Sequence, residues 1–257
     1  MEKINVEYTH GGSVAKIVLQ DENGNVLDYL MMEQLQTQLD RFSQNCELKL
    51  ITFEGAGKHF SFGASVEEHQ KEFAATMLRG FHRLFLSLRE LSIPSLAKIS
   101  GQCLGGGLEL ALMCNQMFAD KTARLGQPEI TLGVFPPPAS ILLPEKIGLS
   151  RAEDLLLTGR IIEAEEAESF GLINRIFENK TELQSGTDAW IEQYILPKSA
   201  ASLRFAVRAA RIKFNHVLGN FLPQLESIYV NQLMNTADAN EGIAAFIEKR
   251  KPIWTNA

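Results

Sequence analysis

The sequence predicts an α/β fold with a helical region at the C-terminal end. Short runs rich in Val, Ile, Leu and Phe recur through the first two-thirds of the chain, as is typical of β-strands. Segments with apolar residues at helical spacing lie between these runs, and this alternation favours an α/β body. The last third of the chain shows helical patterns only. With 257 residues, of which 45% are hydrophobic, the chain is long enough to bury a large core.

Four runs in the first hundred residues predict strands. They are residues 4–8, 14–19, 48–53 and 95–100. A helix is expected between the second and third runs, because Asp28 is a preferred N-cap residue and apolar side chains then recur on one helical face. These side chains are Met32, Leu35, Leu39 and Phe42.

The middle of the chain shows a clear helix start. Ser150 and Glu153 have the spacing of a capping box, and Gly159 stands where that helix should end. A short helix over residues 164–170 and a strand over residues 172–177 are expected next. After about residue 182 no further strand is predicted.

We expect one compact body, since no linker rich in Pro, Ser or Gly divides the chain. Within it, residues 1–181 form the predicted α/β core and residues 182–257 form the predicted C-terminal helical region.

The composition excludes several classes of protein. A net charge of −6 argues against a nucleic-acid partner, because such binding depends on neutralising phosphates with Lys and Arg. Cys46, Cys103 and Cys114 show no metal-binding spacing and favour a reducing compartment. The N-terminal residues contain no apolar signal core, and no run is long enough to span a bilayer. We therefore expect a cytoplasmic protein with no membrane partner and no bound metal.

Two glycine-rich segments follow predicted strands. The first contains Gly55, Gly57 and Gly63. Glycine lets the backbone approach a ligand closely, and an amide at a strand-to-helix junction can point at a developing negative charge. A glycine-rich turn without a ligand is the alternative interpretation.

The second segment, Gly105, Gly106 and Gly107, directly precedes strong helix formers. Such a run costs about 0.5–1 kcal/mol per glycine relative to alanine inside an element, so something requires it. A helix N-terminus facing a ligand oxygen would do so, and close packing of helix on strand is the alternative. Glu109 falls in the first turn of this helix, among apolar neighbours. Burial there would raise its pKa and suit acid–base chemistry, although a glutamate that only complements the helix dipole also fits.

A second carboxylate, Glu129, follows a Gly-Gln-Pro turn. Two carboxylates that flank a substrate can divide the work of hydration, one deprotonating water and the other handling the proton on carbon. Sequence spacing does not show that Glu109 and Glu129 meet. By itself, Glu129 is better explained as a residue of a surface loop.

Taken together, these segments resemble the crotonase (enoyl-CoA hydratase/isomerase) superfamily. The family order of Phe-x-x-Gly-Ala, Gly-Gly-Gly-x-Glu-Leu-Ala and Leu-Gly-Gln-Pro-Glu is found within residues 54–133, and the similarity continues to Glu-Gly-Ile-Ala-Ala-Phe at 241–246. The resemblance implies a crotonase-like spiral of ββα repeats with a C-terminal helical trimerisation region. It also implies a homotrimer or dimer of trimers, an acyl-CoA substrate, and no metal or redox cofactor.

The resemblance also implies roles for individual residues. The backbone N–H groups of Ala64 and Gly106 would form an oxyanion hole for the thioester carbonyl and the enolate. Glu109 would activate the water and Glu129 would give a proton to carbon, although the pair can divide these roles differently. The residues implied in coenzyme A binding are Lys58, Phe62, Val66, Phe246 and Lys249. For the two lysines, an exposed surface position is an equally good explanation.

Two segments depart from the common family pattern. Ser65 stands where an aspartate is usual, and a Pro-Pro-Pro-Ala-Ser stretch with Pro136, Pro137 and Ser140 replaces a glycine-rich turn of the substrate pocket. Because Pro137 has no N–H, a backbone donor that commonly helps to hold the water is absent. Both segments are similar to the family's hydratases of anaerobic aromatic degradation, which act on cyclohexa-1,5-diene-1-carbonyl-CoA. This similarity implies 6-hydroxycyclohex-1-ene-1-carbonyl-CoA as the product.

Other functions remain as alternatives. A general short-chain enoyl-CoA hydratase or isomerase is one, and a catalytically silent scaffold or RNA-binding relative is another. The pair of glutamates and the acidic net charge argue against the silent scaffold and the RNA-binding relative. His59 and His69 lie near the first glycine-rich segment, but we interpret them as solvated or capping residues, since the sequence fixes no partner carboxylate for either.

Overall fold

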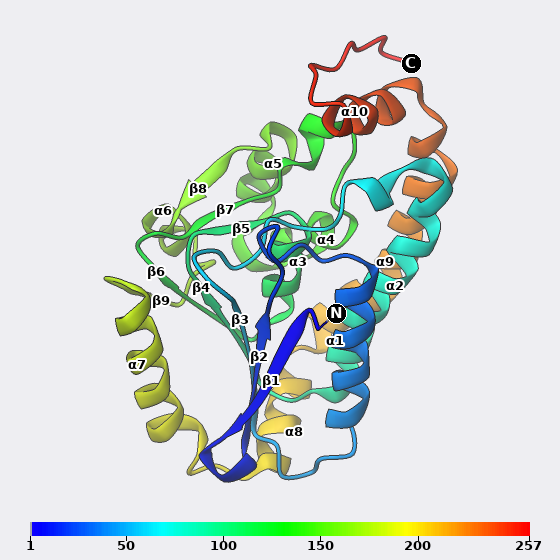
Figure 1. Ribbon diagram of the computed structural model, residues 1–257. Coiled ribbons are helices and arrows are strands. Elements are labelled where there is room, and N and C mark those ends of the chain that lie inside the picture. The colour runs from blue at the N-terminus through cyan, green and yellow to red at the C-terminus, as the bar shows by residue number, and fades with distance from the viewer. Residues whose placement is uncertain (1) are drawn as a thin grey trace.

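The computed structural model describes residues 2–257, which form a mixed α/β fold (Figure 1). Its main sheet has six strands in the order β1-β2-β3-β4-β6-β9. Their bounds are β1 Ile4–Thr9, β2 Val14–Leu19, β3 Leu50–Gly55, β4 Ser95–Ile99, β6 Gln116–Asp120 and β9 Arg175–Phe177. Only β1 and β2 pair antiparallel in this sheet. A second sheet, in the order β5-β7-β8, consists of β5 Gln102–Leu104, β7 Arg124–Gly126 and β8 Ile161–Glu163.

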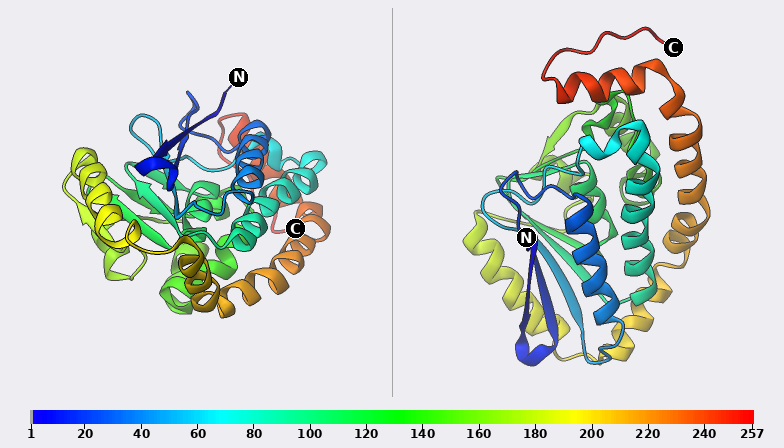
Figure 2. Two further views of the ribbon diagram at one scale, coloured as in Figure 1. Left: turned by 90° about the horizontal axis from the view of Figure 1, so that it is seen from below. Right: turned by 45° about the vertical axis from the view of Figure 1, so that its right-hand side comes forward.

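Helices cover both faces of the main sheet. The bounds are α1 Tyr29–Phe42, α2 Lys71–Leu91, α3 Gly106–Met113, α4 Pro137–Ile147, α5 Leu149–Thr158, α6 Ala164–Ser169, α7 Lys180–Trp190, α8 Ala200–Ala210, α9 Ile212–Asn231 and α10 Ala237–Ile247. In Figure 1, α1 and α2 lie to the right of the sheet and α7 lies to the left. Helix α9 runs beside α2 and also packs on α4 (Figure 2). The C-terminal helices therefore reach back to the α/β part of the chain.

The central strands are buried on both faces. In β3, Ile51 and Phe53 belong to the larger core with α1 and α2, whereas Leu50 belongs to a smaller cluster with Leu183 of α7. Parallel strands that are covered by helices on both sides read as continuous apolar runs. This explains why the sequence pattern identified them.

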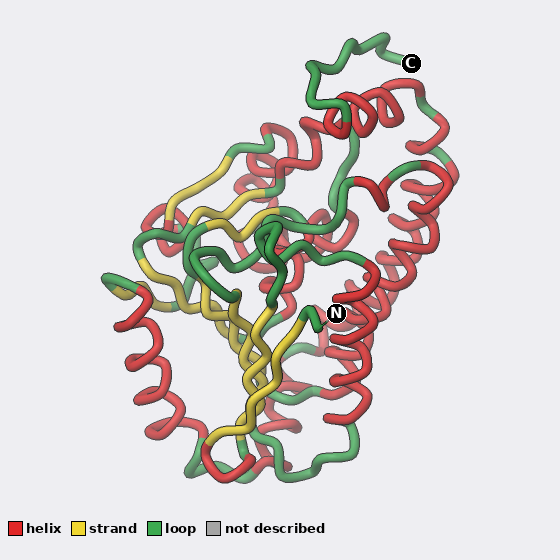
Figure 3. Tube along the Cα trace, in the orientation of Figure 1, coloured by secondary structure: helices red, strands yellow, loops and turns green. Residues whose placement is uncertain are grey.

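Several predicted elements are confirmed. Asp28 caps α1, since its side chain accepts a hydrogen bond of 2.9 Å from the backbone N–H of Met31. Gly159 ends α5 in the left-handed region, at φ 65°. Figure 3 shows that the chain after β9 forms helices and loops, as expected for the region beyond residue 182.

Two predictions about the middle of the chain are wrong in detail. Helix α5 begins at Leu149 with Gly148 as its N-cap, so Ser150 already lies inside the helix and makes no capping box. The strand predicted over residues 172–177 is confined to Arg175–Phe177. The amides of Leu172 and Ile173 instead donate to the carbonyl oxygen of Ala167, because they complete the end of α6.

Among the helices of residues 2–257, none is long and apolar enough to cross a bilayer.

Candidate active site

One cavity of about 780 Å³ brings together the predicted oxyanion and acid–base residues. Ala64, Gly106, Glu109 and Glu129 all line it. They converge because the segments that carry them leave neighbouring parallel strands at the same edge. In the small sheet, Leu104 of β5 lies opposite Gly126 of β7, and a parallel bridge joins Ser61 to Cys103 on the other side. Ligands bind at the carboxyl ends of such strands in open α/β folds.

Ala64 and Gly106 lie side by side in the lining of the cavity. Gly106 is the first residue of α3, so its N–H has no partner within the helix. The bridge between Leu27 and Ala64 uses the groups on either side of Ala64, which leaves the Ala64 N–H free. Neither amide donates to another protein group within residues 2–257. A free amide at a helix N-terminus, with a second free amide beside it, suits the binding of one negatively charged oxygen.

The glycine run is explained by close approaches at this point. A methyl group on Gly106 would lie 3.0 Å from the Ala64 nitrogen, and one on Gly105 would lie 2.6 Å from Oε1 of Glu129. Gly105 also has a φ of 48°. Both proposed reasons for the run therefore apply, since close packing and access to the free amides require the same small residues.

Glu109 is buried, with 4% of its surface exposed. It lies in the first turn of α3, and its Oε1 accepts a hydrogen bond of 2.9 Å from the backbone N–H of Ala139 near the start of α4. Burial raises the pKa of Glu109 well above its ordinary value, and the negative charge of Glu129 raises it further. The Ala139 hydrogen bond opposes this rise in pKa.

Glu129 lies in a short 3₁₀ helix, Pro128–Leu132, and is half-buried. Burial raises its pKa. The side-chain amide of Gln127, which is fully buried, faces both carboxylate oxygens at 3.1 Å when its nitrogen is the donor. Because both glutamates have raised pKa values and their charges interact, the pair can hold one proton near neutral pH and offer an acid and a base.

Known proteins resemble this chain over nearly its whole length. The family model described as "Enoyl-CoA hydratase/isomerase" matches residues 9–257. The chain belongs to this family. The predicted enzyme class, a hydro-lyase, is confirmed at the level of the family.

Two curated members illustrate the relationship. A "Cyclohexa-1,5-dienecarbonyl-CoA hydratase" from Thauera aromatica is 41% identical over 95% of this chain and 94% of its own. A "2,3-dehydroadipyl-CoA hydratase" from Escherichia coli is 30% identical over 89% of each chain.

Solved structures of family members have the same fold. An enoyl-CoA hydratase from Mycobacterium avium superposes with a TM-score of 0.87 over 99% of both chains, at 22% identity. One from Bacillus anthracis gives 0.78 over the whole of both chains, at 30% identity. The predicted crotonase-like fold with C-terminal helices is therefore confirmed.

Only some of the residues that the resemblance implies in coenzyme A binding line the cavity. Phe62, Val66 and Phe246 line the cavity. Lys58 and Lys249 are exposed and do not line it. Lys3, for which the sequence pattern gives no signal, also lines the cavity and forms ion pairs of 2.7 Å with Asp21 and 2.6 Å with Asp28.

The proline stretch forms one wall of this cavity. Pro136 and Pro137 line it, and Pro137 and Pro138 are the first two residues of α4. Ser140 does not line it, and its hydroxyl donates to the carbonyl oxygen of Pro136 at 2.7 Å. Proline is well accepted at the first turn of a helix, where its missing N–H has no helical partner to lose.

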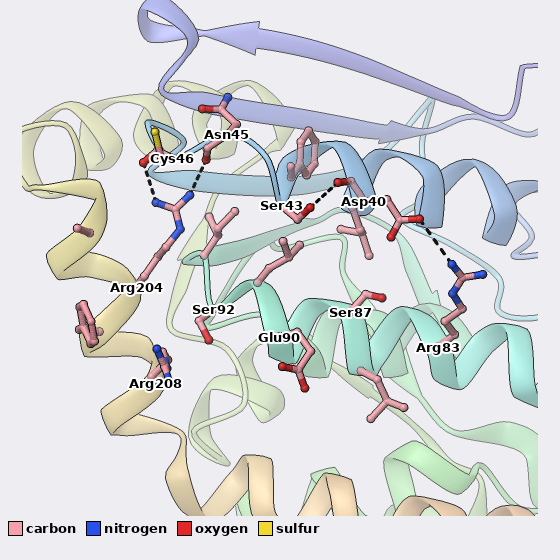
Figure 4. A pocket seen from close by; sticks show the side chains of 17 residues that line it. Asp40, Ser43, Asn45, Cys46, Arg83, Ser87, Glu90, Ser92, Arg204 and Arg208 are labelled. Atoms are coloured by element: carbon pink, nitrogen blue, oxygen red, sulfur yellow. Dashed lines mark hydrogen bonds and ion pairs between the residues drawn. The ribbon is translucent and has the colours of Figure 1, made fainter.

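A second cavity, of about 660 Å³, lies between α1, α2 and α8 (Figure 4). Its polar groups are engaged locally: Arg204 donates to the carbonyl oxygens of Asn45 and Cys46 at 2.7 and 2.9 Å, and Arg83 lies 3.6 Å from Asp40. Its described lining includes neither a pair of buried carboxylates nor a free helix N-terminus. The residues that the family resemblance implies for catalysis line the first cavity and not this one.

Proposed function

We propose that the protein adds water to cyclohexa-1,5-diene-1-carbonyl-CoA and forms 6-hydroxycyclohex-1-ene-1-carbonyl-CoA. The observation that carries the proposal is the meeting of two free amides and two carboxyl groups of raised pKa in one cavity. The name of the Thauera aromatica relative, at 41% identity, supports the choice of acyl group.

In this proposal the thioester carbonyl oxygen accepts hydrogen bonds from the N–H groups of Ala64 and Gly106. As the nucleophile adds, negative charge moves onto this oxygen. Each oxyanion donor typically contributes about 3–4 kcal/mol to transition-state stabilisation. The two amides therefore lower the barrier to forming the enolate.

The two glutamates divide the proton transfers. Glu109, held in place by the Ala139 N–H, takes a proton from water as the oxygen bonds to the ring carbon beside the acyl-bearing carbon. The resulting dienolate takes a proton from Glu129 at the far end of the diene. One water is consumed, and the pair keeps one proton in total.

The stiff wall at Pro136 and Pro137 supports a compact ring better than a long flexible chain, because prolines restrict the backbone that borders the cavity. Phe62, Val66 and Phe246 are the residues we propose for contact with coenzyme A. Lys58 and Lys249 would reach its phosphates only at the margin of the site.

The test is an assay of the purified protein with cyclohexa-1,5-diene-1-carbonyl-CoA and with crotonyl-CoA. We expect a higher kcat/KM for the cyclic substrate, with formation of the hydroxylated ring product. Turnover of crotonyl-CoA alone would make the protein a general enoyl-CoA hydratase and remove the cyclic assignment. Turnover of neither would remove the proposed function.

A further inference from the structure

The hydroxyl group of Tyr229 is buried without a partner. Tyr229 lies on α9, 1% of its surface is exposed, and its hydroxyl makes no hydrogen bond to any group of residues 2–257. Leaving a buried polar group unpaired costs about 1–3 kcal/mol. A phenylalanine would avoid this cost, so the hydroxyl calls for an explanation.

The tyrosine ring stands directly behind the wall of the active-site cavity. Its centroid lies 5.4 Å from that of Phe135, in an edge-to-face contact, and 6.5 Å from that of His69. Phe135 and His69 both line the cavity. The unpaired hydroxyl is thus carried by a side chain that packs on the site.

Both glutamates act electrostatically on the hydroxyl. Burial raises the pKa of Tyr229, and the negative charges of Glu129 and then Glu109 raise it further. The phenol therefore stays protonated at every pH at which the enzyme would work, and it can donate a hydrogen bond. Its partner is neither glutamate, since no hydrogen bond joins them.

The backbone donors at the start of α4 are missing or occupied. Pro137 and Pro138 open α4 and have no N–H. The next amide, of Ala139, donates to Glu109, and that of Ser140 donates to the carbonyl oxygen of Pro136 at 2.9 Å. The start of α4 therefore offers no hydrogen to a water molecule held between the two carboxyl groups.

We propose that Tyr229 donates the hydrogen bond that orients the oxygen added to the substrate. The water gives its hydrogens to the carboxyl groups, accepts one hydrogen bond from the Tyr229 hydroxyl, and directs its remaining lone pair at the carbon. In the product, the same hydroxyl of Tyr229 contacts the new hydroxyl group. This role rests on the proposed hydration, and Tyr229 itself neither gains nor loses a proton.

The first test compares Tyr229→Phe with wild type and with Tyr194→Phe, which removes a phenol hydroxyl from a side chain that is 46% exposed. We expect Tyr229→Phe to lower kcat about ten-fold or more with little change in KM, because a lost hydrogen bond to the reacting oxygen acts in the transition state. Its thermal unfolding midpoint should equal or exceed that of wild type, since the hydroxyl is unpaired in the free protein. A kcat within about two-fold of wild type would overturn the proposal.

The second test measures binding and needs no turnover. We would titrate wild type and Tyr229→Phe with 3-hydroxybutyryl-CoA and with butyryl-CoA. The variant should bind the hydroxylated ligand about ten-fold more weakly and the saturated ligand equally well. An equal change for both ligands would show a purely structural role. This comparison also separates the two proposals, because it reports on Tyr229 even if wild type hydrates neither acyl-CoA.

Discussion

At the scale of single residues, Glu129 is the most direct test of the chemistry. Its carboxyl has a raised pKa and can donate a proton near neutral pH. We expect Glu129→Gln to lower kcat by roughly 100- to 10,000-fold, because general acid catalysis commonly contributes this much. Affinity for a saturated acyl-CoA, measured by calorimetry, should be nearly unchanged. Glu168→Gln, at an exposed position, is the matched control, and a Glu129→Gln enzyme with wild-type turnover would refute the role.

The raised pKa of Glu129 also predicts how stability depends on pH. Between the ordinary value of 4.5 and the raised value, the folded protein binds more protons than the unfolded chain, so the free energy of unfolding falls as pH rises. Glu129→Gln removes this effect. Its unfolding midpoint should therefore exceed that of wild type at alkaline pH, and the difference should shrink toward acidic pH. A difference that is independent of pH would contradict the shift.

Some residues of the site can be predicted from the sequence and others cannot, for physical reasons. Glu109 could be singled out because it follows a glycine run inside an apolar helix. Glu129 looked like a loop residue until the family pattern was considered, since nothing local shows that β5 and β7 are neighbours. Tyr229 was missed because tertiary packing alone brings it against Phe135 of the cavity wall, and Gln127 was missed because sequence does not show that its side chain turns toward Glu129. The Gly-Gln-Pro-Glu order was the one available signal for Gln127.

At the scale of elements, the N-terminus of α3 depends on the glycines that begin it. A methyl group on Gly106 would lie 3.0 Å from the Ala64 nitrogen and would obstruct the space between the two amides. Gly106→Ala should therefore lower kcat by about 100-fold or more, as loss of an oxyanion donor does. Steady-state kinetics would measure this change.

The control for this substitution is Gly80→Ala in the middle of α2. A methyl group there meets no atom within 4 Å, and Gly80 has an ordinary helical backbone. Alanine should stabilise the helix by about 0.5–1 kcal/mol and leave kcat unchanged. Equal activity of the two variants would show that the amides of α3 do not bind the carbonyl oxygen.

Elements were predicted well where local chemistry decides them. The buried strands and the Asp28 cap follow from apolar runs and a side-chain hydrogen bond within one turn. The start of α5 was missed because Gly148 separates it from α4, and helix-to-helix junctions of this kind are set by packing. The helix that begins at Pro137 also carries Pro144 inside it, which local propensity disfavours.

At the scale of the whole molecule, the C-terminal helices do more than cover the sheet. Helix α9 packs Tyr229 against Phe135 of the cavity wall, and α10 contributes Phe246 to the cavity lining. The division into residues 1–181 and 182–257 remains a prediction. The proposed site uses residues of both parts. We therefore expect changes in the helical region to affect turnover as well as assembly.

The surface of this helical region predicts self-association. Helix α8 buries none of its residues within the chain, although one of its faces is apolar. Phe205 is 67% exposed, and Ile212 at the start of α9 is 71% exposed. Large apolar side chains left this exposed are typical of an interface, and the family resemblance implies a homotrimer or dimer of trimers.

We expect light scattering of the wild-type protein to give the mass of three or six chains. Adding charge at the interface through Phe205→Glu with Ile212→Glu should shift that mass toward a single chain, because an unpaired charge is costly to bury. Ile161→Glu is the control, since Ile161 is an exposed apolar residue of β8, away from α8. A wild-type monomer, or a double variant that keeps the wild-type mass, would show that the apolar face of α8 does not join copies of this chain.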